Sequence, residues 1–203
     1  MTYQECEALT VHQLIASLKS KGYKVFEDDR KNYNLNIVGI RTSENKVNTF
    51  NDFQIVFWKY KGVWNIRKYF ITTDPGLYWL NNPMNKLGTA ILKEGQYLGS
   101  HKLGLHQGKY TALVQAKPVT VVRDYNRDDN LDFDSGREET GFFGINIHNS
   151  GSILSIYVNR WSAGCNVHED PYAYKEFIQV LENSKDLWGN SFTYTLIRDT
   201  DIQ

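Results

Sequence analysis

The side chains of Cys165 and His148 provide the two groups that thiol-based catalysis needs, a nucleophile and a base. A cysteine nucleophile also requires backbone N–H groups that stabilise the oxyanion, and a sulfur that is not crowded. Gly164 directly precedes Cys165, and glycine allows a tight turn in which the amides of both residues can point to one spot above the sulfur. This arrangement predicts that Cys165 is a nucleophile with His148 as its base.

Several neighbours of this pair are expected to support it. Ser162 can hold the loop before Cys165 through its hydroxyl group. Asn146 lies two positions before His148 and so projects from the same face of a strand, which makes either Asn146 or a backbone carbonyl a candidate to orient the imidazole. Four further residues are candidates for contact with a substrate: Trp161, Tyr110, His106 and Asn166.

Structural explanations of the same residues remain open. A single cysteine is often a small buried apolar residue, His148 can be a hydrogen-bonded residue at a strand end, and aromatic rings commonly pack in the core. His101 and His106 lie in a glycine-rich segment that could fold over a cleft, although such histidines are more often exposed. A zinc site needs three or four converging ligands, and Cys165 with His168 has no matching second pair, so no metal and no cofactor is expected.

One acidic segment has oxygen-bearing side chains at alternate positions, as a calcium-binding loop does: Asp124, Asn126, Asp128, Asn130 and Asp132. However, Asp129 stands where the sharp turn of such a loop requires glycine, and Ser135 stands where the bidentate glutamate belongs. The segment is therefore expected to be a solvated loop rather than a calcium site.

The order of the chemical residues resembles the L,D-transpeptidase catalytic family, whose signature is a histidine followed at comparable distance by Ser/Thr-His-Gly-Cys. The matching segments are Gly144-Ile-Asn-Ile-His148 and Ser162-Ala-Gly-Cys165, and Thr73-Asp-Pro-Gly-Leu-Tyr-Trp-Leu80 resembles a threonine-proline-glycine segment of the family less specifically. This chain has Ala163 where the family often has a second histidine, and it lacks the arginine that often follows the cysteine. That arginine commonly shapes the substrate pocket, so the resemblance defines the nucleophile better than the substrate.

The resemblance implies a reaction on peptidoglycan stem peptides. Cys165 would attack a peptide carbonyl, His148 would take the thiol proton and return it to the leaving amine, and a thioester would form. Reaction of the thioester with an amine gives a crosslink, and reaction with water gives hydrolysis. Two alternatives remain: a cysteine amidase or peptidase on a non-wall substrate, and a carbohydrate-binding or virion-structural module without turnover, which 5 Trp and 13 Tyr residues also suit.

Composition narrows the partners and the compartment. Lys plus Arg and Asp plus Glu both number 23, so the basic surface of a nucleic-acid binder is not expected. Two cysteines are too few for a disulfide framework, and Cys6 lies in a polar N-terminal segment that is expected to be mobile.

No stretch reaches the roughly 18 apolar residues of a membrane span, and no signal peptide is recognisable, which predicts a cytoplasmic chain as synthesised. A phage-encoded enzyme that reaches the cell wall after release would reconcile a cytoplasmic location with a cell-wall substrate. The sequence predicts no oligomeric state.

The elements that must position these residues are expected to be mainly β. Thr10 caps an amphipathic helix that ends at Gly22, and Asp170-Pro171 opens a second helix that runs to about Leu187. Strands are expected at 24–26, 35–41, 53–60, 63–72, 88–92, 109–115, 119–123, 141–148, 152–158 and 191–197. The pattern therefore predicts a β-sandwich or barrel with an N-terminal helix and a C-terminal helix–strand pair. The resemblance implies that this fold is of L,D-transpeptidase type, with residues 1–50 packed on a main domain of residues 51–203.

Overall fold

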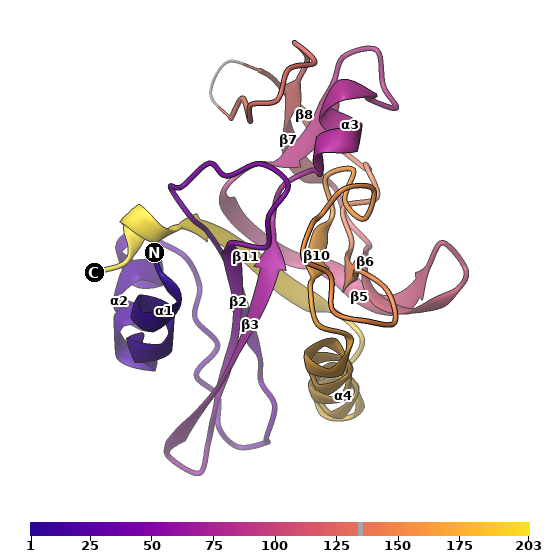
Figure 1. Ribbon diagram of the computed structural model, residues 1–203. Coiled ribbons are helices and arrows are strands. Elements are labelled where there is room, and N and C mark those ends of the chain that lie inside the picture. Colours follow the sequence, from indigo (N-terminus) through magenta and orange to yellow (C-terminus); the bar gives the residue numbers. More distant parts are fainter. Residues whose placement is uncertain (134–135) are drawn as a thin grey trace.

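The computed structural model describes residues 1–133 and 136–203 and shows a closed β-barrel with a smaller sheet beside it (Figure 1). Among these residues the barrel strands run in the order β1 (Asn36–Arg41), β11 (Phe192–Arg198), β5 (Gly95–His106), β6 (Tyr110–Gln115), β9 (Ile147–Asn149), β10 (Asn166–His168), β3 (Val63–Thr72) and β2 (Asp52–Tyr60). The smaller sheet is formed by β4 (Thr89–Leu92), β7 (Val119–Asp124) and β8 (Arg137–Gly141). The expected mainly β class is confirmed.

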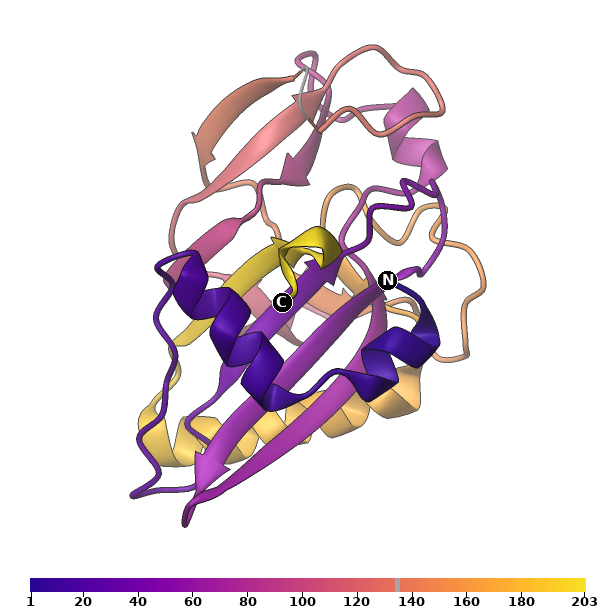
Figure 2. The same ribbon diagram turned by 90° about the vertical axis from the view of Figure 1, so that its left-hand side faces the viewer.

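The helices cover two sides of the barrel (Figure 2). The N-terminal pair, α1 (Tyr3–Ala8) and α2 (Val11–Ser20), lies over β2 and β3, whereas α4 (Pro171–Trp188) lies on the other side. Thr10 forms a capping box at the start of α2, and Asp170 caps α4, as their sequences predict. The short α3 (Leu77–Asn81) precedes β4, and a 3₁₀ turn (Asp199–Asp201) follows β11.

Strands β1 and β2 are buried on both faces, because alternate residues enter different apolar clusters. Ile37 and Val56 belong to the cluster that contains Phe177 of α4. Their neighbours Val38 and Ile55 belong to the cluster that contains Leu14, Leu18 and Cys6 of the N-terminal helices. The N-terminal segment is therefore an ordered layer, and the expectation that Cys6 lies in a mobile terminus is wrong: Cys6 is 2% exposed.

A buried ionic network fixes the turn after β3. The Arg41 guanidinium, which is fully buried, donates hydrogen bonds to the Asp74 and Glu94 carboxylates and to the Thr73 carbonyl. Asp52 accepts hydrogen bonds from the backbone N–H and hydroxyl of Thr73. Gly76 lies in the same turn, and its N–H donates to the Ser162 carbonyl at 2.9 Å. The network therefore also supports the loop that carries Cys165.

Three expected strands differ in the structure. Residues 24–26 are not a strand, and of residues 141–148 only the two ends, Gly141 and Ile147–His148, lie in strands. Residues 152–158 form a loop, because β9 and β10 pair in parallel and must be joined by a crossover rather than a hairpin. Conversely, the expected glycine-rich loop of residues 100–108 overlaps the twelve-residue β5, which continues to His106.

Candidate functional site

The pairing of β9 with its neighbours places the catalytic candidates on one face. Val167 of β10 pairs with His148 of β9, and the Asn166 N–H donates to the Asn146 carbonyl at 2.9 Å, so Cys165 lies beside Asn146. Residues that pair across strands share a face, and successive residues alternate. The side chains of Asn146, His148 and Cys165 therefore point to the outer face of the barrel, whereas Asn166 points to the interior.

The loop that carries Cys165 is closed by the Ser162 hydroxyl. This group donates to the Cys165 carbonyl at 2.7 Å and accepts the Gly164 N–H at 3.1 Å. Gly164 has φ +118°, and a Cβ there would lie 2.1 Å from the Ala90 carbonyl oxygen of β4, so the loop lies directly against the smaller sheet. The expectation that the amides of Gly164 and Cys165 both face one oxyanion is wrong in one respect, because the Gly164 N–H is already bonded.

The Cys165 thiol is partly exposed and hydrogen-bonded to backbone. Its Sγ donates to the Gly144 carbonyl at 3.2 Å and accepts the Asn146 N–H at 3.5 Å. The side chain also packs on Phe50 and Val158. Burial of the sulfur raises the pKa of Cys165 to about 11, so the thiol is protonated at neutral pH.

His148 is a buried neutral imidazole with a defined tautomer. Its Nδ1 lies 2.8 Å from the Asn149 carbonyl, which can only accept, so Nδ1 carries the proton and Nε2 carries the lone pair. The Tyr110 hydroxyl lies 3.1 Å from the same Nδ1. Burial, with a smaller contribution from His106, lowers the pKa of His148 to about 4. Nε2 is buried and has no hydrogen-bond partner among the described residues, so His148 and Cys165 are not bonded to each other in this structure.

Asn146 orients a second imidazole rather than that of His148. Its Oδ1 accepts the Gln115 N–H at 2.9 Å, so its Nδ2 must face and donate to Nδ1 of His106, 3.1 Å away. Of the two predicted candidates for orienting His148, the structure therefore shows a backbone carbonyl, that of Asn149, and not Asn146. The rings of His106 and His148 stack with centroids 4.0 Å apart.

The other candidates are placed as follows. Tyr110 contacts His148, as described above, and Trp161 is 45% exposed and packs over Gly151. Asn166 is fully buried in the barrel, where its Oδ1 accepts the Tyr194 hydroxyl at 3.1 Å, so the expectation that it contacts substrate is wrong. The expected exposure of His101 is also wrong, because this residue is fully buried.

Two residues that sequence reasoning missed shape the backbone next to Cys165. The His101 Nε2 bonds the Ile145 carbonyl at 2.9 Å, and the Gln115 side-chain Oε1 accepts the N–H groups of Phe143 and Ile145, both at 3.0 Å. The segment between these bonds provides the Gly144 carbonyl that holds the thiol. The glycine at position 144 is the local sequence signal of this turn, since Gly144 adopts φ +72°. The side chains that bond the neighbouring backbone, His101 and Gln115, are distant in sequence.

Two cavities are lined by sequence neighbours or contacts of the catalytic candidates. One of ≈ 420 Å³ is lined by Tyr110, Asn149 and Tyr174, and one of ≈ 270 Å³ is lined by Ala163, Thr89 and Arg123. The Arg123 guanidinium is bonded to Glu139 and to the Gly88 carbonyl. Neither cavity is lined by Cys165 or His148 themselves.

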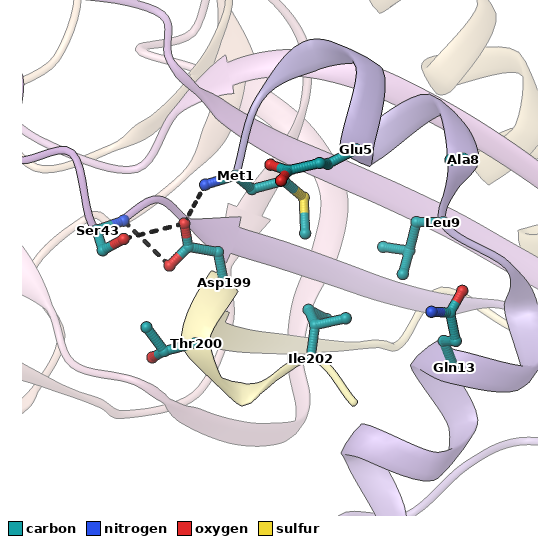
Figure 3. A pocket seen from close by; sticks show the side chains of 9 residues that line it. All are labelled: Met1, Glu5, Ala8, Leu9, Gln13, Ser43, Asp199, Thr200 and Ile202. Carbon is teal, nitrogen blue, oxygen red and sulfur yellow. Dashed lines mark hydrogen bonds and ion pairs between the residues drawn. The ribbon is translucent and has the colours of Figure 1, made fainter.

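Another cavity, of ≈ 480 Å³, lies between the N-terminal helices and the C-terminal 3₁₀ turn (Figure 3). There the Met1 amino group forms an ion pair with Asp199, which also accepts the N–H and hydroxyl of Ser43. None of its lining residues belongs to the candidate site, so this cavity contributes nothing to the chemistry of Cys165.

The crossover between β9 and β10 exposes a run of apolar side chains. Ile153, Leu154, Ile156 and Tyr157 are each more than half exposed. The loop is anchored where the Val158 N–H donates to the Asn48 carbonyl. Val158, at the end of this loop, belongs to the apolar cluster against which Cys165 packs.

The acidic segment after β7 has no metal-binding arrangement among the residues that the structure describes. Asp124 is fully buried, its Oδ2 accepts the Asp132 N–H, and burial raises the pKa of Asp124 to about 6. Ser135, at the position of the calcium-binding glutamate, lies outside the described residues, as does Asp134.

The comparisons with known proteins do not identify a relative. No protein-family model, no curated protein and no solved structure matches this chain. In the described ranges, no helix is long and apolar enough to cross a membrane.

Proposed function

We propose that this protein is a cysteine acyl-transfer enzyme in which Cys165 attacks a peptide carbonyl and His148 accepts the thiol proton. The observation that carries the proposal is the tautomer of His148. Its Nδ1–H is bonded to the Asn149 carbonyl, which leaves a basic Nε2 without a partner among the described residues, on the face that also bears Cys165. A general base needs such an unoccupied lone pair, and in the proposed reaction Nε2 comes within hydrogen-bond reach of the thiol when substrate binds.

The proton must move during the attack. The pKa of Cys165 is raised to about 11 and that of His148 is lowered to about 4, so both groups are neutral at pH 7. As the sulfur–carbon bond forms, the thiol proton leaves the Gly144 carbonyl and passes to Nε2 of His148. The imidazolium then gives the proton to the leaving amine, and a thioester remains on Cys165.

The proposed substrate class is the peptidoglycan stem peptide. It is supported by the resemblance of the His148 and Ser162–Cys165 segments to the L,D-transpeptidase signature. The resemblance implies two peptide partners, one that donates the acyl group and one that accepts it. Attack on the thioester by an amine of the second peptide would give a crosslink, and attack by water would give a free carboxylate.

The test is incubation of the protein with purified stem tetrapeptides, followed by mass spectrometry of the intact protein and of the products. Wild type should give an acyl adduct together with a cleaved or crosslinked product, and Cys165→Ala should give neither. Cys6→Ala is the matched control, because Cys6 is the other free cysteine and lies on the buried face of α1. An adduct that persists in Cys165→Ala, or that never forms on any stem, would refute the proposal.

One observation favours a second candidate, a binding module without turnover. The thiol is bonded to the Gly144 carbonyl and not to His148, an arrangement that a purely structural cysteine would also show. Alkylation with iodoacetamide separates the two functions, since a nucleophile reacts in the folded protein. A Cys165 that resists the reagent until the protein unfolds would favour the binding module.

A further inference from the structure

The two stacked imidazoles of the site have opposite tautomers. His148 donates from Nδ1 to the Asn149 carbonyl, so its Nε2 is an acceptor. His106 accepts at Nδ1 from the Asn146 amide, whose orientation is fixed by the Gln115 N–H, so its Nε2 carries a proton. The pair therefore presents one basic nitrogen and one N–H donor from rings that are 4.0 Å apart.

The loop beside Cys165 lacks one of the donors that acyl transfer needs. A carbonyl that is attacked by sulfur develops negative charge on its oxygen, and two N–H donors commonly stabilise it. The Gly164 N–H is bonded to the Ser162 hydroxyl, which leaves the Cys165 N–H as the free amide of the pair within the described residues. A second donor must come from another element.

We propose that His106 is a further catalytic residue whose Nε2–H donates to the oxygen of the carbonyl that Cys165 attacks. Asn146 connects the two residues, because its side chain holds His106 and its backbone N–H contacts the Cys165 sulfur. His106 is 8% exposed, no protein group among the described residues pairs with its Nε2, and this atom is not among the buried unpaired ones, so it keeps contact with solvent. This assignment rests on the proposed function.

His106 acts as a neutral donor. Burial and the nearby Lys109 lower its pKa, so the ring is uncharged at neutral pH. The imidazolium that forms on His148 is then stacked on a neutral ring rather than beside a second cation. A neutral imidazole can polarise a carbonyl in this way when its environment disfavours the charged form.

The test compares two reagents for Cys165. Alkylation by iodoacetamide needs a reactive sulfur but forms no oxyanion, whereas acylation by p-nitrophenyl acetate needs both. His106→Leu removes the donor and is expected to slow acylation by about a hundredfold while the alkylation rate stays near that of wild type. His106→Gln places an amide N–H that does not titrate near the same position and should recover most of the acylation rate. His12→Leu, a change at an exposed histidine of α2, is the control.

Each outcome decides between distinct conclusions. Equal losses of acylation and alkylation in His106→Leu would show that the residue only maintains the structure around the thiol, and unchanged acylation would also overturn the role. If wild type shows no acylation that depends on Cys165, the proposed function fails and the role of His106 fails with it. ¹⁵N NMR of the imidazoles provides an independent check, because a proton on Nδ1 of His106 at pH 7 would refute the donor assignment alone.

Discussion

Replacement of Gly164 by alanine tests whether the loop that carries Cys165 is held against the smaller sheet. The backbone at Gly164 has φ +118°, where a side chain costs about 1–3 kcal/mol, and the new Cβ would lie 2.1 Å from the Ala90 carbonyl oxygen. Relief of that overlap by backbone shifts adds about 1–3 kcal/mol. A total of about 4 kcal/mol predicts a fall in Tm of roughly 8–16 °C for a chain of this size.

The matched control is Gly62→Ala in the turn between β2 and β3. Gly62 has φ +81°, but a Cβ added there would meet nothing within 4 Å, so only backbone strain of about 1–2 kcal/mol is expected. Calorimetry should therefore show the larger loss for Gly164→Ala, and only this variant should change the alkylation rate of Cys165, since it displaces the Ser162 bonds. Equal losses of stability in the two variants would refute the close packing of the loop on β4.

Two further predictions concern protonation. The pKa of Cys165 is raised to about 11 and that of His148 is lowered to about 4. The alkylation rate of Cys165 in wild type should therefore rise about tenfold per pH unit from pH 7 to pH 10, as the thiolate fraction grows. A rate that is already constant below pH 7 would instead reveal a preformed thiolate–imidazolium pair. Burial lowers the pKa of His101 to about 4, below the value of about 6.5 in an unfolded chain. As the pH falls, the unfolded state therefore binds the proton before the folded state does. The free energy of unfolding should decrease as the pH falls from about 6.5 to about 4. Urea denaturation of wild type and His101→Gln measures this, and an equal pH dependence in both proteins would exclude His101 as a source.

The clearest failures of sequence interpretation arise where pairing between distant strands decides the structure. Residues 100–108 contain Gly104 and Gly108 and are predicted to form a loop, yet residues 95–106 form β5 because β6 and β11 offer partners on both sides. Residues 152–158 are rich in isoleucine, leucine and valine, which predicts a strand, yet β9 and β10 already pair with each other. A strand forms only where an edge is available, and local composition does not contain that information.

The sequence by itself determined the elements with strong local signals and the chemical identity of the candidate site. The capped helices α2 and α4 and the β2–β3 hairpin follow from turns, caps and alternation within short segments. Only the tertiary structure decided how the side chains are used. Asn166 is inside the barrel and Asn146 donates to His106, because both contacts depend on register between strands, where a shift by one residue moves every side chain to the opposite face.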